Sequence, residues 1–158
     1  VAVMMSFIYQ IRELQNGGEF VVLLFLAAWG NDTLAYCTGM LIGKHKMSPI
    51  LSPKKSIEGL VGGIVGAAIL GALYGLYLNT YIRFSFNPVT MFPIVCGLGG
   101  AVSVIGDLAA SAIKRDSGIK DYGTLIPGHG GILDRFDSII FIAPVIYYLT
   151  VMISGGAI

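Results

Sequence analysis

Four long apolar runs constrain the fold of this chain more than any other feature. They cover residues 20–43, 59–82, 88–113 and 136–158, and each contains at most one charged residue. A helix needs about 20 residues to cross roughly 30 Å of hydrocarbon, so each run is long enough to span a membrane. A fifth run, Val1–Ile11, is too short to span, and we interpret it as the end of a longer helix with further helices before it. The predicted fold is an all-α, polytopic integral membrane bundle, with four full spans and a truncated N-terminal helix in one domain over 1–158.

The composition excludes several classes of protein. Only 12% of the residues are charged and 55% are hydrophobic, whereas soluble domains carry about 25% charged residues. A disordered tail, a basic nucleic-acid-binding domain and an ordinary soluble globule are therefore excluded. Cys37 and Cys96 both lie within apolar runs, which predicts buried thiols and no disulfide.

The basic residues predict the orientation of the spans. Two spans separate the loops 43–58 and 114–135, so both loops must lie on the same side of the membrane. The positive-inside rule places the side with the excess of Lys and Arg in the cytoplasm. Only Arg12 and Arg83 fall on the other side, and the two loops hold the remaining eight basic residues: Lys44, Lys46, Lys54, Lys55, Lys114, Arg115, Lys120 and Arg135.

Two carboxylates lie inside the predicted spans, where ionisable groups are costly and usually mark a functional interior. Asp32 lies about 18 Å along its helix from Phe20. Asp107 lies on a face of small and polar residues at i, i+4 spacing, which predicts contact with protein or a water-filled cavity. That face consists of Gly99, Ser103, Asp107 and Ser111. Both acids also admit a purely structural interpretation. Asp107 could make only a helix–helix hydrogen bond, and Asp32 could be satisfied locally by Asn31, Thr33 and Tyr36.

The second run carries small residues at every fourth position: Gly59, Gly63, Ala67, Gly71 and Gly75. A stripe of this kind lets helix backbones approach closely within a membrane, so it predicts a helix-packing face.

The loop 114–135 and the start of the fourth run hold the densest polar cluster. Glycines around His129 can bring backbone N–H groups close to an anion, and the neighbouring basic residues supply the counter-charge for phosphate. Asp134 and Asp137 are three residues apart at a helix start and, with Asp107, could form an all-oxygen Mg²⁺ site. Alternatively, Asp134 caps the helix and Asp137 occupies its N3 position. Both carboxylates would then only interact favourably with the helix dipole. His129 could donate a proton, contact phosphate or merely hold the loop, and a zinc site is disfavoured because no cysteine is near it in sequence.

Two segments resemble one family. The downstream segment is Ser111-x-x-Lys114-Arg115-x₄-Lys120-Asp121-x-Gly123-x₃-Pro127-x-His129-Gly130-Gly131-x-x-Asp134-Arg135-x-Asp137. The upstream segment is Asp32-Thr33-x-Ala35-Tyr36, Gly39, Gly43-Lys44 and Ser52-Pro53-Lys54-Lys55-Ser56-x-Glu58-Gly59. Together they resemble the phosphatidate cytidylyltransferases, also called CDP-diacylglycerol synthases. Departures are Ser56, where threonine is common, Ile57, where an aromatic residue is frequent, and the additional N-terminal helices of bacterial members.

The resemblance implies transfer of a cytidylyl group from CTP to phosphatidate, giving CDP-diacylglycerol and pyrophosphate. The expected place is the cytoplasmic face of the bacterial inner membrane, with Mg²⁺, or a pair of metal ions, as cofactor. Asp32 is expected to support the site. The expected metal ligands are Asp107, Asp134 and Asp137. The expected catalytic residues are Lys114, Arg115, Lys120 and His129. The expected substrate-binding residues are Lys54, Lys55, Ser111, Gly128, Gly130, Gly131 and Arg135.

Three alternatives remain open from the sequence. A related CTP-dependent enzyme could act on another membrane lipid, such as an isoprenoid phosphate or alcohol or an archaeal lipid. An ion-coupled transporter could use a carboxylate relay through Asp32 and Asp107, although the charges cluster near one face. The chain could also only scaffold a larger complex, in which case it would not bind CTP. A homodimer is compatible with each of these interpretations, and nucleic acid is not an expected partner.

Overall fold

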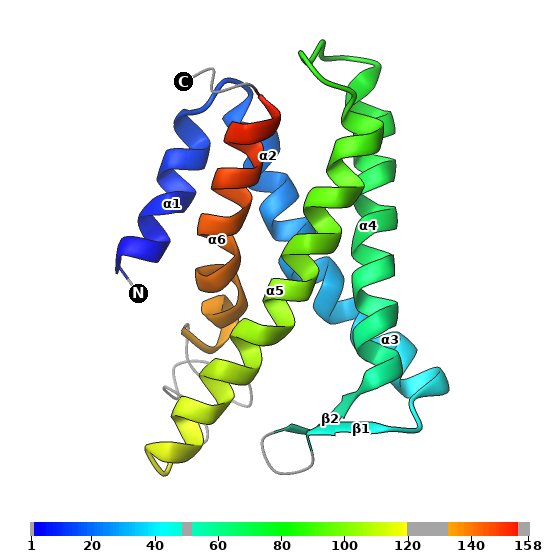
Figure 1. The fold of residues 1–158 in the computed structure, drawn as a ribbon, viewed down its shortest axis with the longest axis vertical. Helices are drawn as coiled ribbons and strands as arrows, with labels where there is room; N and C mark the ends of the chain where they lie inside the picture. The colour runs from blue at the N-terminus through cyan, green and yellow to red at the C-terminus, as the bar shows by residue number, and fades with distance from the viewer. Residues whose placement is uncertain (1, 49–51, 120–132, 155–158) are drawn as a thin grey trace.

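The computed structural model describes the backbone of residues 2–48, 52–119 and 133–154, and all of their side chains except those at 48, 52–54 and 133–135. Within these residues the chain forms a helical bundle with one small hairpin (Figure 1). The elements, in order, are α1 (Ala2–Glu13), α2 (Gly17–Phe25), the π-helix η1 (Leu26–Gly30), α3 (Asn31–Ile42), β1 (Lys46–Ser48), β2 (Ser52–Ser56), α4 (Ile57–Asn79), α5 (Pro88–Asp116) and α6 (Leu133–Ile153).

Four helical segments of the described chain are long and apolar enough to cross a membrane. They are Gly17–Ile42, Ile57–Asn79, Pro88–Asp116 and Phe136–Ile153. The predicted class, a polytopic helical membrane protein with four spans and a shorter N-terminal helix, is therefore confirmed. The predicted end of the fourth span at 158 lies outside the described residues.

The first span is not a uniform α-helix. The π-helix η1 separates α2 from α3, and the three pieces cross the bundle, so that α2 lies beside α6 while α3 lies beside α4 (Figure 1). Wide π turns of this kind occur frequently at functional sites. Here the π turn immediately precedes Asn31 and Asp32.

The small-residue stripe on α4 packs as predicted. All five of its residues are buried. A Cβ atom added to Gly63 would come within 2.8 Å of the Ala35 Cβ on α3, and one added to Gly71 would come within 2.7 Å of the Phe92 carbonyl oxygen on α5. The N-terminal half of α4 therefore packs against α3, and the C-terminal half packs against α5.

The segment 43–58, predicted as a loop between two spans, contains a two-stranded antiparallel hairpin in which Lys46 pairs with Ser56. The base of the hairpin is closed by His45. Its carbonyl accepts a hydrogen bond of 3.0 Å from the Ile57 N–H, and its Nδ1 lies 2.6 Å from Glu58 Oε1. The hairpin and the C-terminal end of α5 lie at the same end of the bundle, which agrees with the prediction that both basic loops share one side (Figure 1).

The predicted burial of Cys37 is wrong. Both cysteines are free, as expected, and Cys96 is buried, but Cys37 is exposed on α3. The length and hydropathy of an apolar run predict a membrane span, but they do not determine which of its side chains face protein and which face lipid.

Ser56 ends the hairpin and caps α4. Its Oγ accepts a hydrogen bond of 3.1 Å from the Gly59 N–H. We predict that Ser56→Ala lowers the free energy of unfolding in detergent by about 1 kcal/mol, because the helix loses a side-chain cap. Ser56→Thr keeps a capping hydroxyl and is expected to unfold at the wild-type denaturant concentration. Equal stability of the Ala and Thr variants would show that the cap contributes nothing.

Candidate active site

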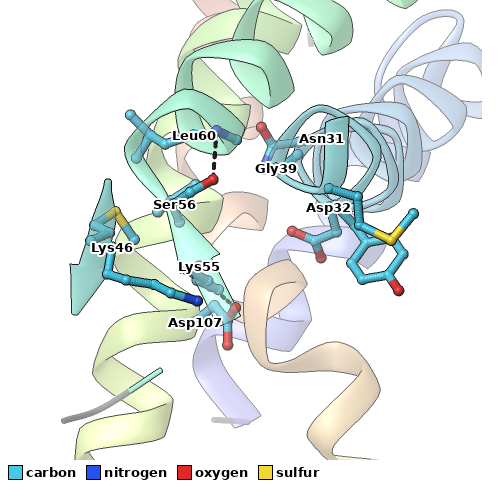
Figure 2. A pocket seen from close by; sticks show the side chains of 14 residues that line it. Asn31, Asp32, Gly39, Lys46, Lys55, Ser56, Leu60 and Asp107 are labelled. Atoms are coloured by element: carbon cyan, nitrogen blue, oxygen red, sulfur yellow. Dashed lines mark hydrogen bonds and ion pairs between the residues drawn. The ribbon is translucent and has the colours of Figure 1, made fainter. Parts of the chain in front are cut away.

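A cavity of about 560 Å³ lies between α3, the hairpin, α4 and α5 (Figure 2). One part of its wall is polar, and the remainder is apolar. The residues with polar side chains that line it are Asn31, Asp32, Tyr36, Lys46, Lys55, Ser56 and Asp107. Cavities of roughly 300–1,000 Å³ are typical of small-molecule and cofactor sites.

Lys55 and Asp107 form an ion pair across this cavity. The Lys55 Nζ on β2 contacts the Asp107 Oδ2 on α5, and the two side chains are 29% and 24% exposed (Figure 2). The polar face of α5 therefore meets protein and a cavity, as its spacing predicts, and Ser103 on that face is fully buried. The partner of Asp107 comes from the hairpin, so the contact is not the simple helix–helix hydrogen bond considered above.

Asp32 lines the same cavity from α3. Two intramembrane carboxylates from separate spans, Asp32 and Asp107, thus face one space that also contains the Lys55 ammonium. Figure 2 shows the Lys46 side chain extending into this space from the other strand of the hairpin. The two acids therefore belong to one site and are not distributed along a path through the bundle.

A second charge pair lies nearer the C-terminal end of α5. The Lys114 Nζ is 3.7 Å from the Asp137 Oδ2 on α6, and these side chains are only 11% and 12% exposed. The Asp137 Oδ1 also accepts a 2.8 Å hydrogen bond from the Ser138 N–H. Lys114 follows Asp107 by seven residues, about two helical turns or roughly 10 Å along the same face of α5. The structure therefore arranges both pairs along the face that the sequence singled out.

The other predicted site residues are less fully placed. Ser111 is half-buried on α5, one turn beyond Asp107, and Arg115 is exposed near the end of that helix. Lys54 belongs to β2, and Asp134 and Arg135 belong to the first turn of α6, but their side chains are not described. Five predicted residues lie outside the described residues altogether: Lys120, Gly128, His129, Gly130 and Gly131.

Sequence reasoning missed several residues of this cavity as site candidates, among them Lys46 and Asn31. Lys46 was recognised only as part of the basic loop, and its place in the cavity follows from hairpin pairing that the sequence did not predict. Asn31 was considered only as a local partner of Asp32. The signal that could have marked it is an amide next to a carboxylate within an apolar run.

The oxygen ligands of the cavity fit Mg²⁺ better than a softer metal. Asp32 and Asp107 supply carboxylates, and Mg²⁺ is usually held by one or two carboxylates together with substrate phosphate oxygens. Among the side chains that the structure describes, no three His, Cys, Asp or Glu residues form a metal-binding group. Two carboxylates alone would leave most of the coordination positions of such an ion to other oxygen atoms.

The fold and the cavity define a polytopic membrane protein with a charged site near one end of its helical bundle. The sequence model of the cytidylyltransferase family matches residues 1–153. The chain therefore belongs to the cytidylyltransferase family.

Curated relatives carry a more specific name. A phosphatidate cytidylyltransferase of Staphylococcus saprophyticus is 37% identical over 148 residues, which is 94% of this chain and 55% of the relative. A phosphatidate cytidylyltransferase of Staphylococcus aureus is 38% identical over 151 residues, which is 96% of this chain and 55% of that relative. The chain thus spans about half the length of these relatives.

Proposed function

We propose that this protein transfers a cytidylyl group from CTP to phosphatidate, giving CDP-diacylglycerol and pyrophosphate. The observation that carries the proposal is the cavity in which Asp32 and Asp107, from separate spans, face Lys55. The matching family and the names of the relatives supply the reaction class. Phosphoryl chemistry needs charge neutralisation and positioning, and this cavity offers both kinds of group.

The proposed reaction is a direct displacement at the α-phosphorus of CTP. A phosphate oxygen of phosphatidate forms the new bond, the bond to the bridging oxygen of the β-phosphate breaks, and pyrophosphate leaves with that electron pair. The lipid phosphate is already anionic near neutral pH, so no activated serine or cysteine is needed. The main obstacle is repulsion between two highly charged anions, which cations relieve.

The described residues provide paired charges that could be shared with the substrates. Lys55 lies against Asp107, and Lys114 lies beside Asp137, so each lysine can turn toward a phosphate once a cation engages its carboxylate. We assign Asp107 to hold Mg²⁺, supported by Asp32 in the same cavity and joined by Asp134 and Asp137 from the start of α6; the ion would neutralise phosphate charge when bound. Phosphate contacts are proposed for Lys54, Ser111, Arg115, Lys120, Gly128, His129, Gly130, Gly131 and Arg135.

The proposed reaction takes place at the cytoplasmic face of the bacterial inner membrane. CTP is water-soluble and phosphatidate is a membrane lipid, so the site must be open to both phases. The hairpin and the C-terminal end of α5, which carry Lys46, Lys55 and Lys114, lie at one end of the bundle. The positive-inside rule favours placing this end in the cytoplasm.

Pyrophosphate release from CTP tests the proposal directly. Membranes containing the full-length protein should release pyrophosphate only when phosphatidate and Mg²⁺ are both present, and labelled CTP should yield a labelled lipid. The same assay with an isoprenoid phosphate or alcohol tests the choice of lipid. A labelled product from another lipid but not from phosphatidate would overturn the assigned substrate, and no CTP-dependent product with any lipid would overturn the reaction.

Lys55 should contribute strongly to CTP use. We predict that Lys55→Gln lowers kcat/KM for CTP by on the order of 10²-fold, because a cation aimed at developing phosphate charge is lost. Lys44→Gln is the matched control, because Lys44 is an exposed lysine of the same loop that does not line the cavity. The rate of pyrophosphate release at limiting CTP measures both. Equal losses in the two variants would show that Lys55 acts only through the net charge of the loop.

A further inference from the structure

A second lysine reaches the cavity from the hairpin. Lys46 lies on β1, whereas Lys55 lies on β2, and both side chains line the cavity. Lys46 is exposed, and Figure 2 shows its side chain extending into this space. An ammonium group in that position is accessible to a ligand that enters the cavity.

The backbone that carries Lys46 is fixed by the residue before it. The His45 carbonyl accepts a hydrogen bond of 3.0 Å from the Ile57 N–H. The His45 N–H donates to the Glu58 carboxylate, at 3.2 Å from Oε2, and the His45 Nδ1 lies 2.6 Å from Oε1. Lys46 itself pairs with Ser56, whose side chain caps α4. The start of β1 is therefore tied to the first turn of α4, and Glu58 provides a side-chain part of that connection.

The contact between His45 and Glu58 is better suited to setting position than to adding stability. The side chain of His45 is 75% exposed and that of Glu58 is 23% exposed. Exposed charge pairs contribute little to global stability, because water and salt screen the attraction. Their geometry can still select one backbone arrangement, since this carboxylate engages both the backbone and the ring of the same residue. Loss of the contact is thus expected to displace β1, and with it Lys46, without unfolding the bundle.

The charges of the cavity indicate which ligand chemistry suits Lys46. Among the described residues that line the cavity, Asp32 and Asp107 are acidic and Lys46 and Lys55 are basic, so their formal charges cancel. The proposed reaction brings two phosphate-bearing substrates together, and their negative charges must be offset. Lysine provides a compact point charge that binds phosphate. Lys55 can serve one phosphate group, and a second lysine allows another phosphate to be held at a separate point.

We propose that Lys46 binds a phosphate group of one substrate and that Glu58, acting through His45, is the positioning residue that holds Lys46 in place. The proposal rests on the proposed function and adds Lys46 to the phosphate-binding residues of the cavity. The phosphate belongs either to CTP or to phosphatidate. Separate measurement of the KM for each substrate distinguishes these two sources.

Steady-state kinetics of the full-length protein in membranes test the role of Lys46. Lys46→Gln should raise the KM for the substrate whose phosphate it binds by about 10–100-fold, which corresponds to the loss of a hydrogen bond between charged groups. The KM for the other substrate should stay close to the wild-type value. Lys44→Gln is the matched control, because Lys44 is exposed in the same loop and does not line the cavity. Unchanged KM values for both substrates in Lys46→Gln, an equal rise in both, or an equal effect of Lys44→Gln would overturn the proposal.

A double-mutant cycle tests the role of Glu58. Glu58→Ala alone should raise the same KM, and His45→Ala should do so too, because it removes the ring side of the contact. Adding Glu58→Ala to Lys46→Gln should cause no further rise, because a residue that acts only through Lys46 then has nothing left to position. An unchanged KM in Glu58→Ala and His45→Ala, or additive effects in the double variant, would overturn the positioning role. A wild-type protein that makes no product from CTP and phosphatidate would instead overturn the proposed function, and this assignment with it.

Discussion

Replacing Asp107 with asparagine is expected to lower the rate of CTP- and phosphatidate-dependent pyrophosphate release by on the order of 10³-fold. Asparagine keeps the shape of the side chain but removes the negative charge. The Lys55 ammonium then loses its partner, and a divalent cation loses a carboxylate ligand. The initial rate at saturating substrates, measured across a range of Mg²⁺ concentrations, reports the effect. Asp134→Asn is expected to cause a comparable loss.

The matched control is Asp116→Asn. Asp116 lies on the same helix, is exposed at its end and does not line the cavity. Its substitution should leave the rate unchanged. Thermal unfolding in detergent should show that both Asp107→Asn and Asp116→Asn are folded. A folded Asp107→Asn variant with a near-normal rate would remove Asp107 from the site.

Gly71→Ala is expected to destabilise the bundle by about 1–3 kcal/mol, which is the usual cost of overpacking a tight interface. Its new Cβ atom would lie 2.7 Å from the Phe92 carbonyl oxygen and 2.9 Å from the Phe92 carbonyl carbon. These are backbone atoms of α5, so a rotamer change cannot relieve the clash and the two helices must move apart. The denaturant concentration at half-unfolding in detergent measures the loss.

Gly97→Ala is the matched control for Gly71→Ala, because Gly97 lies on α5 and faces α4 at a place where there is room for a methyl group. The nearest atom to its new Cβ would be the Ala68 Cβ at 3.7 Å, which is an ordinary contact. Alanine also loses less backbone entropy than glycine on folding, by roughly 0.5–1 kcal/mol within a helix. Gly97→Ala should therefore be neutral or slightly stabilising. Equal destabilisation by the two substitutions would show that close backbone contact is not what sets the cost.

The helical part of the fold could be predicted because it depends on local pattern. The length of an apolar run determines whether it can span a membrane, and spacing by four places small residues such as Gly63 and Gly71 on one face. The same reasoning placed Asp107 on a protein-facing side of its helix. The prediction that Cys37 is buried was wrong because hydropathy does not distinguish a lipid-facing position from a protein-facing one.

The assembly of the site could not be predicted because it depends on contacts between distant segments. Lys55 and Asp107 are 52 residues apart, and they meet only because the hairpin lies beside α5. The hairpin itself carries no alternating apolar pattern in Lys46–Ser48 or Ser52–Ser56, so the usual signal for a strand is absent. The π-helix before Asn31 likewise lacks a recognisable signature in its sequence.

Binding of Mn²⁺ in the presence of CTP, followed by electron paramagnetic resonance, tests most directly whether this cavity is the nucleotide and metal site. Full-length wild-type protein should bind the ion, Asp116→Asn should bind it equally well, and Asp107→Asn should bind it about 10–100-fold more weakly. Wild-type affinity in a folded Asp107→Asn variant would contradict the assignment of this cavity as the place where CTP and a divalent cation meet.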